Sequence, residues 1–120
     1  MVSPINTALS GLAAASTRIA VSTENVANQF SKNYVPKQVD QVTLSAGAVR
    51  AVVKDVDPAT TPIFNPSDPD ADVNGTVQLP NVDLANELVN QSIASYDYKA
   101  NLQSIKAADN LQKSLLDILS

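Results

Sequence analysis

Acidic and amide side chains in the middle of the chain have the spacing of one known metal site. Asp70, Asp72 and Asn74 alternate with other residues and are followed by Gly75. A calcium-binding EF-hand loop opens in this way, with oxygen ligands at alternate positions and a glycine for the sharp turn. The bidentate glutamate that should follow is Asn81, and the flanks are rich in proline instead of helical. The run therefore predicts a structural turn held by aspartate side chains, not a calcium site.

Paired carboxylates are the other groups that could do chemistry. Asp55 with Asp57, or the cluster that begins at Asp68, could serve as acid and base only if their surroundings separated their pKa values. Aspartates in exposed loops are more often simply solvated. The chain has no Cys, no His and no Trp, which removes thiol and imidazole catalysis, disulfides and the usual zinc ligands. We therefore expect no enzymatic activity, no cofactor, no metal and no small-molecule substrate.

The net charge and the hydropathy of the chain exclude further classes of function. The net charge is −4 and no segment is basic, so nucleic acid is not expected as a partner. No apolar run reaches about 18 residues, so direct membrane insertion is not expected. The opening Met-Val-Ser-Pro has neither the cationic nor the apolar region of a secretory signal, which argues against a cleaved Sec signal peptide. Two Phe and three Tyr are few for a round core, so an extended molecule of paired helices is favoured.

The elements that must position these residues begin with an N-terminal helix, predicted from about residue 5 to about residue 29. Apolar residues recur there at every seventh position, at Ile5, Leu12, Ile19 and Val26. A second line follows each of them by four, at Leu9, Ser16, Thr23 and Phe30. Both spacings lie on one face of an α-helix. The positions that would complete the seam are small, at Ala8, Ala15 and Ser22, so this helix should be stable only when packed against others.

The rest of the chain predicts a β-rich middle and a second helix. Residues 35–80 hold six of the seven prolines, with short strands expected at 39–44, 48–56 and 76–79 and a loop at 57–75. The second helix should start at Asp83, a good N-cap residue, and continue to about residue 119 without Gly or Pro. Its apolar residues include Leu88, Tyr98, Leu102 and Ile105, and Leu111, Leu115 and Leu119 widen the surface near its end.

The predicted fold is therefore mainly α: two long amphipathic helices that pair as a coiled-coil-like hairpin, with a small irregular β-rich insert. Residues 1–34 and 81–120 would form one discontinuous helical domain and residues 35–80 the insert. Because the second helix is longer, a hairpin would leave part of it uncovered, and we expect both termini to pack onto other subunits. The alternative is a monomeric hairpin with the β-element folded over it.

Several residues are expected to act in this packing. Arg18 would either contact an acidic group across a subunit boundary or extend from the exposed face. Asn25 and Asn101 are expected to set the register of the helices. The residues predicted at subunit interfaces are Ile5, Leu9, Leu12, Arg18, Ile19, Val26, Leu88, Tyr98, Leu102, Ile105, Leu111, Leu115 and Leu119.

The N-terminal segment resembles the bacterial flagellar axial proteins, the rod and hook family. ALSGLAA at 8–14, RIAV at 18–21 and ENVAN at 24–28 match three successive blocks of that family. The fourth block is usually Thr-x-Gly-Tyr and is SKNY at 31–34 here. Asn33 takes the place of the glycine, and asparagine is the best other residue for a left-handed turn.

The C-terminal half is similar to the same family at 81–89, 98–101 and 105–109, and residues 65–81 resemble a run of its short proximal-rod members. One His and two Tyr of that run are replaced by Asp68, Thr76 and Leu79. The resemblance implies a helical domain stacked inside a tube, with the middle projecting outward, in the basal-body rod that crosses the periplasm of Gram-negative cells. It implies copies of the chain itself, other axial proteins and the flagellar type III export apparatus as partners. The alternative is a soluble helical binding module or secretion adaptor that kept the rod pattern.

Overall fold

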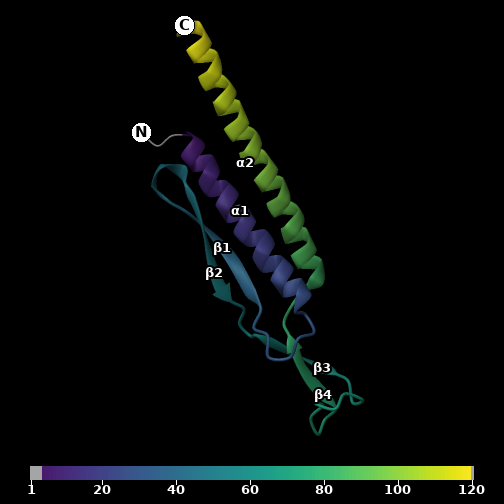
Figure 1. The fold of residues 1–120 in the computed structure, drawn as a ribbon. Helices are drawn as coiled ribbons and strands as arrows, with labels where there is room; N and C mark the ends of the chain where they lie inside the picture. The colour runs from purple at the N-terminus through teal and green to yellow at the C-terminus, as the bar shows by residue number, and fades with distance from the viewer. Residues whose placement is uncertain (1–3, 120) are drawn as a thin grey trace.

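A computed structural model describes residues 4–119. The prediction that the N-terminus is no cleaved Sec signal peptide concerns residues that lie partly outside this range. The element order is α1 (Pro4–Ala27), β1 (Lys37–Thr43), the 3-10 turn η1 (Ser45–Gly47), β2 (Val49–Asp55), β3 (Thr60–Phe64), β4 (Thr76–Pro80) and α2 (Leu84–Leu119). Figure 1 shows α1 and α2 side by side, β1 and β2 beyond α1, and β3 and β4 at the far end. The molecule measures 79 × 23 × 16 Å. The predicted pair of long helices around a small β-rich insert is confirmed.

The two helices run antiparallel. Ser22, near the end of α1, donates a hydrogen bond from Oγ to the Glu87 carbonyl in the first turn of α2 (2.9 Å), whereas Gly11 lies against Asn101 further along α2. Pro4 begins α1, where its missing N–H costs nothing. Asp83 is the N-cap of α2, as predicted, because its Oδ1 accepts hydrogen bonds from the backbone N–H groups of Ala85 and Asn86.

Small side chains form the contact between the helices. Ala15 of α1 and Ala94 of α2 are both 0% exposed, and Ala8 and Ser22 are buried on the same face of α1. A Cβ atom on Gly11 would stand 2.6 Å from Asn101 Oδ1, so the Asn101 side chain packs directly on the backbone of α1 there. The predicted seam residues Ile5, Leu12, Ile19 and Val26 are half-buried beside this contact. The small positions therefore face α2, and the large ones lie at its border.

β1 and β2 form an antiparallel hairpin that packs on α1. Val39 pairs with Val53 and Thr43 with Val49, and η1 joins the two strands. The N–H of Val49 donates to Ser10 Oγ of α1 (3.0 Å), which fixes the start of β2 on the helix. Both predicted strands are therefore present.

β3 and β4 form a second, separate antiparallel pair. The expectation that all of residues 57–75 are loop is wrong, because β3 occupies Thr60–Phe64 within it. Pro62 made this segment look unlike a strand, but it pairs opposite Gln78 in a two-stranded sheet, where a strand with a free edge tolerates proline. Val77 of β4 is buried, whereas Phe64 of β3 is exposed.

The chain turns after α1 although it lacks the glycine that stands at this position in the family pattern. Asn33 has a φ of 64°, in the left-handed region that asparagine tolerates better than other residues with a side chain. The chain then enters β1 through Pro36, which is fully buried. The turn thus brings Tyr34 and Lys37 back to the end of α1.

Candidate assembly surface

One buried asparagine joins the end of α1 to β1 and α2. Asn25 is 1% exposed, and its Nδ2 donates to the Lys37 carbonyl (2.6 Å) and to Glu87 Oε1 (2.8 Å). Its Oδ1 accepts from the Tyr34 hydroxyl (2.8 Å) and from the Lys37 N–H (3.0 Å). Burial raises the pKa of Tyr34 above its ordinary value, and the negative charges of Glu24 and Glu87 add to this effect. Both polar ends of Asn25 are thus fully bonded, and this one side chain joins α1, β1 and α2.

An ion pair holds the middle of the helix hairpin. Arg18 Nη1 donates to Asp97 Oδ2 at 2.9 Å, with the arginine side chain largely covered. The sequence led us to expect either an acidic partner in another subunit or an exposed Arg18; in the structure the arginine is largely covered and its acidic partner, Asp97, lies in the same chain. A role for Arg18 at a subunit boundary stays a prediction.

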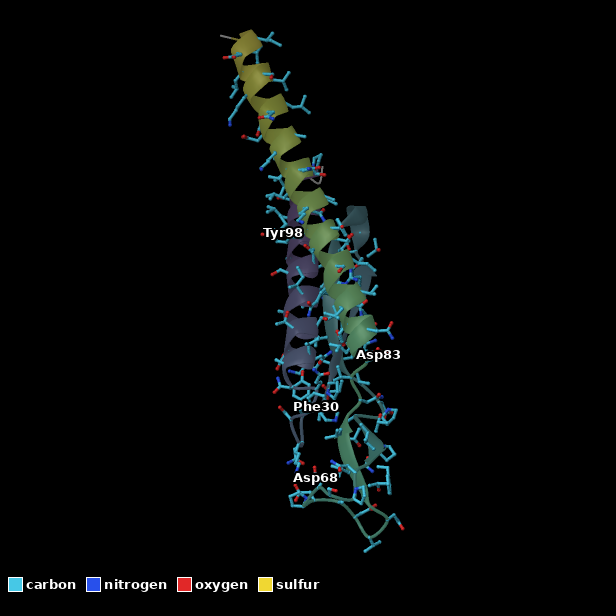
Figure 2. The ribbon with its side chains drawn as sticks, turned by 90° about the vertical axis from the view of Figure 1, so that its right-hand side faces the viewer. Phe30, Asp68, Asp83 and Tyr98 are labelled. Carbon is cyan, nitrogen blue, oxygen red and sulfur yellow. The ribbon has the colours of Figure 1, made fainter. Side chains whose placement is uncertain are left out.

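Large apolar side chains of α2 remain uncovered on both sides of the helix contact. On one side these are Leu84, Leu88, Tyr98 and Leu102, which we call the first stripe. On the other side they are Val89, Ile93 and Tyr96, which we call the second stripe. Figure 2 shows Tyr98 on α2 beside the upper part of α1, and Asp83 at the start of the helix. The residues that α2 turns toward α1 are mostly small or polar, so these large side chains are only partly covered within the described part of the chain.

The end of α2 extends past the start of α1. Every side chain from 109 to 119 is exposed, over a length of about 16 Å. Leu111, Leu115 and Leu119 lie in this overhang, and Leu119 is 84% exposed. Apolar area of this kind on a helix is stabilising only when another surface removes it from water.

The predicted interface residues fall into two groups. Ile5, Leu12, Ile19, Val26 and Ile105 are half-buried beside the helix contact, as is the ion-paired Arg18. Exposed members are Leu9, Leu88, Tyr98, Leu102, Leu111, Leu115 and Leu119. The sequence prediction missed the second stripe, although Val89, Ile93 and Tyr96 follow the spacing of one helix face. Their role at subunit interfaces stays a prediction.

The acidic loop between β3 and β4 is bonded to itself and to Lys32. Asp72 accepts hydrogen bonds from the N–H of Thr76 (2.9 Å) and of Asn74 (2.8 Å), and the first of these holds its pKa below the ordinary value. The Asp70 N–H lowers the pKa of Asp68 in the same way. Lys32 pairs with Asp68 and Asp70, and the bond to Asp70 raises its pKa. Figure 2 shows Asp68 in this loop, below Phe30. The carboxylates are used as turn-forming acceptors, and residues 4–119 hold no cluster of three metal-ligating side chains.

Comparison with known proteins gives the class that this hairpin belongs to. The family model described as the C-terminal part of the flagellar basal-body rod FlgEFG proteins matches residues 73–118, which cover β4 and α2. Residues 4–119 contain no helix with the length and hydropathy of a membrane span. The match to the family model points to the class of flagellar basal-body rod proteins.

Relatives in several bacteria narrow the family. The flagellar basal-body rod protein FlgC of Yersinia enterocolitica is 36% identical over 121 residues, and that of Escherichia coli O6:H1 is 35% identical; each alignment covers 91% of this chain and 90% of the relative. The FlgC protein of Borreliella burgdorferi is 28% identical over 149 residues, with 99% of this chain and 97% of the relative covered. This chain belongs to the FlgC family of flagellar basal-body rod proteins.

Proposed function

We propose that the chain is a structural subunit of the flagellar basal-body rod, which is exported by the flagellar type III apparatus and polymerises through α1 and α2. Its partners are copies of itself and other axial proteins, and its place is the rod, across the periplasm where the cell is Gram-negative. Residues 1–34 and 81–120 form the assembling domain and residues 35–80 the insert, of which β1 and β2 lie along α1 and β3 and β4 project beyond it.

The single observation that carries this proposal is the uncovered apolar surface of α2. Within the hairpin, α2 turns small and polar residues toward α1, whereas its two stripes and the overhang at 109–119 are exposed. Each leucine or isoleucine side chain that becomes fully buried contributes about 1.5–3 kcal/mol. Neighbouring subunits supply that burial in a polymer, and the family name of the relatives describes a rod.

The overhang provides the test. In cells that lack their own copy, the Leu115→Asp chain should be recovered from purified basal bodies at least about tenfold less than the natural chain, because an unpaired carboxylate is costly in an apolar contact. Swimming should be lost with it. Asn110→Asp is the matched control, since it adds the same charge on the polar side of the overhang, and it should assemble normally.

Cytosolic, exported and basal-body amounts are measured together, so that a loss of export is distinguished from a loss of assembly. Normal recovery of Leu115→Asp in basal bodies would show that the overhang is not an assembly surface. If the natural chain were found only in a cytosolic complex, with swimming intact after its deletion, the rod assignment would fail and the binding-module alternative would replace it.

A further inference from the structure

All the cations of α2 lie in one row. Lys99, Lys106 and Lys113 are each separated by seven residues, so they follow the helix over about 21 Å on one side. All three are exposed. Leu102 stands three residues after Lys99 and four before Lys106, which makes it a surface neighbour of both. The line of cations therefore begins where the first stripe ends: it flanks Leu102 and continues along α2 beyond it.

These three lysines, which we call the lysine row, have few partners within the described part of their own chain. Lys113 pairs with Asp109 one turn earlier at 2.7 Å, and Lys99 lies over the Tyr96 ring at 5.7 Å. Lys106 makes no ion pair within residues 4–119. Charges at seven-residue intervals on one side of a helix, next to an apolar surface, favour a partner helix of opposite charge.

A second copy of the chain does not supply such a partner helix. α1 carries a single acid, Glu24, which faces Lys37 at 3.6 Å. Of the acids in α2, Glu87 bonds Asn25 and Asp97 bonds Arg18, and no two acids of α2 are seven residues apart. Neither helix of a copy can therefore match the row with a line of carboxylates.

We propose that the first stripe and the lysine row bind an amphipathic helix of a different chain, which carries acidic side chains at seven-residue intervals beside its apolar face. This rests on the proposed function and adds to it the chemistry of one neighbour. The apolar stripe contributes the area buried, and the lysine row selects the partner and sets its alignment along α2.

Two labelled peptides test the charge selection on the full-length chain. Both have four heptads with leucine at the seam; one has glutamate and the other lysine at the flanking positions. Each peptide repels itself, so it is free to bind. Fluorescence anisotropy should show binding of the glutamate peptide that weakens as NaCl is raised from about 0.05 to 0.5 M, and little binding of the lysine peptide.

Charge variants supply the controls. Replacing Lys99, Lys106 and Lys113 by glutamine should weaken binding of the glutamate peptide about tenfold, since each exposed pair is worth roughly a factor of two. Replacing the same lysines by glutamate should transfer binding to the lysine peptide. The matched control replaces Lys37, Arg50 and Lys54 of the β1–β2 hairpin by glutamine; it changes the net charge equally and should leave binding unchanged.

Equal binding of both peptides would show that the first stripe binds apolar surfaces without selecting their charge, and it would overturn the proposal. Absence of binding to either peptide would do the same, as would self-association of the chain that depends on the lysine row. These outcomes leave the recovery of the natural chain in basal bodies unaffected, so a failure here is distinct from a failure of the rod assignment.

Discussion

Asn25 shows how much of the arrangement depends on a single side chain. The sequence singled it out as a residue that sets helix register, and the structure places it at the meeting point of α1, β1 and α2. Its partners could not be predicted, because Lys37 and Glu87 lie 12 and 62 residues away and depend on the turn at Asn33. Glu87, in the first turn of α2, accepts a hydrogen bond from Asn25.

Removal of this side chain gives a prediction at the residue scale. Asn25→Ala should lower the free energy of unfolding by about 2–4 kcal/mol, because it leaves the Lys37 backbone groups and the Tyr34 hydroxyl without partners in a covered site. Urea denaturation of the isolated chain, followed by circular dichroism, measures the change. Asn90→Ala, on the exposed surface of α2, should change stability by less than about 0.5 kcal/mol. A loss below about 1 kcal/mol for Asn25→Ala would contradict the role given to it.

At the scale of elements, spacing predicted which segments are helical but not which faces meet. The recurrence of Ile5, Leu12, Ile19 and Val26 correctly indicated a helix, and the absence of Gly and Pro correctly extended the second helix to its end. The face that contacts α2 is instead the small line of Ala8, Ala15 and Ser22. Small residues contribute little to the hydrophobic periodicity of a sequence, although they are the side chains that let two helix backbones approach closely. The sequence prediction missed β3 because Pro62 made its segment look like a loop, although a strand with a free edge tolerates proline.

Gly11 tests how tightly the two helices approach. Gly11→Ala should destabilise the chain by about 1–2 kcal/mol, because the new Cβ would collide with Asn101, and this outweighs the better helix propensity of alanine. The double variant Gly11→Ala with Asn101→Ala should recover most of that loss. Ser16→Ala, on the exposed face of α1, controls for propensity alone. Thermal unfolding of these chains and of Asn101→Ala alone measures the coupling. A Gly11→Ala chain as stable as the natural one would contradict the close contact between Gly11 and Asn101.

At the scale of the whole molecule, the shape departs from that of an ordinary domain. The radius of gyration over Cα atoms is 20.7 Å, whereas a compact chain of this length would have about 14 Å. The shortage of aromatic residues in the sequence anticipated an extended molecule, since few side chains are available to fill a round core. The order of the elements along the long axis could not be read from the sequence, because it depends on the antiparallel pairing of the helices.

Small-angle X-ray scattering of the dilute chain tests this shape directly. A radius of gyration close to 21 Å is expected if the hairpin is formed before assembly. A value near about 35 Å, that of an unfolded chain, would show that the helices become ordered only on neighbouring subunits. A value near about 14 Å would contradict the elongated fold. Circular dichroism on the same sample gives the helix content as a check.

The position of β3 and β4 has a practical consequence for following the protein in cells. Their loop lies at the opposite end of the molecule from the overhang of α2, and Val73 within it is fully exposed (Figure 1). A fluorescent or affinity label inserted in this loop would stay clear of both helices. A label placed after α2 would stand beside the uncovered leucines, so the loop is the better site for an assembly-competent reporter.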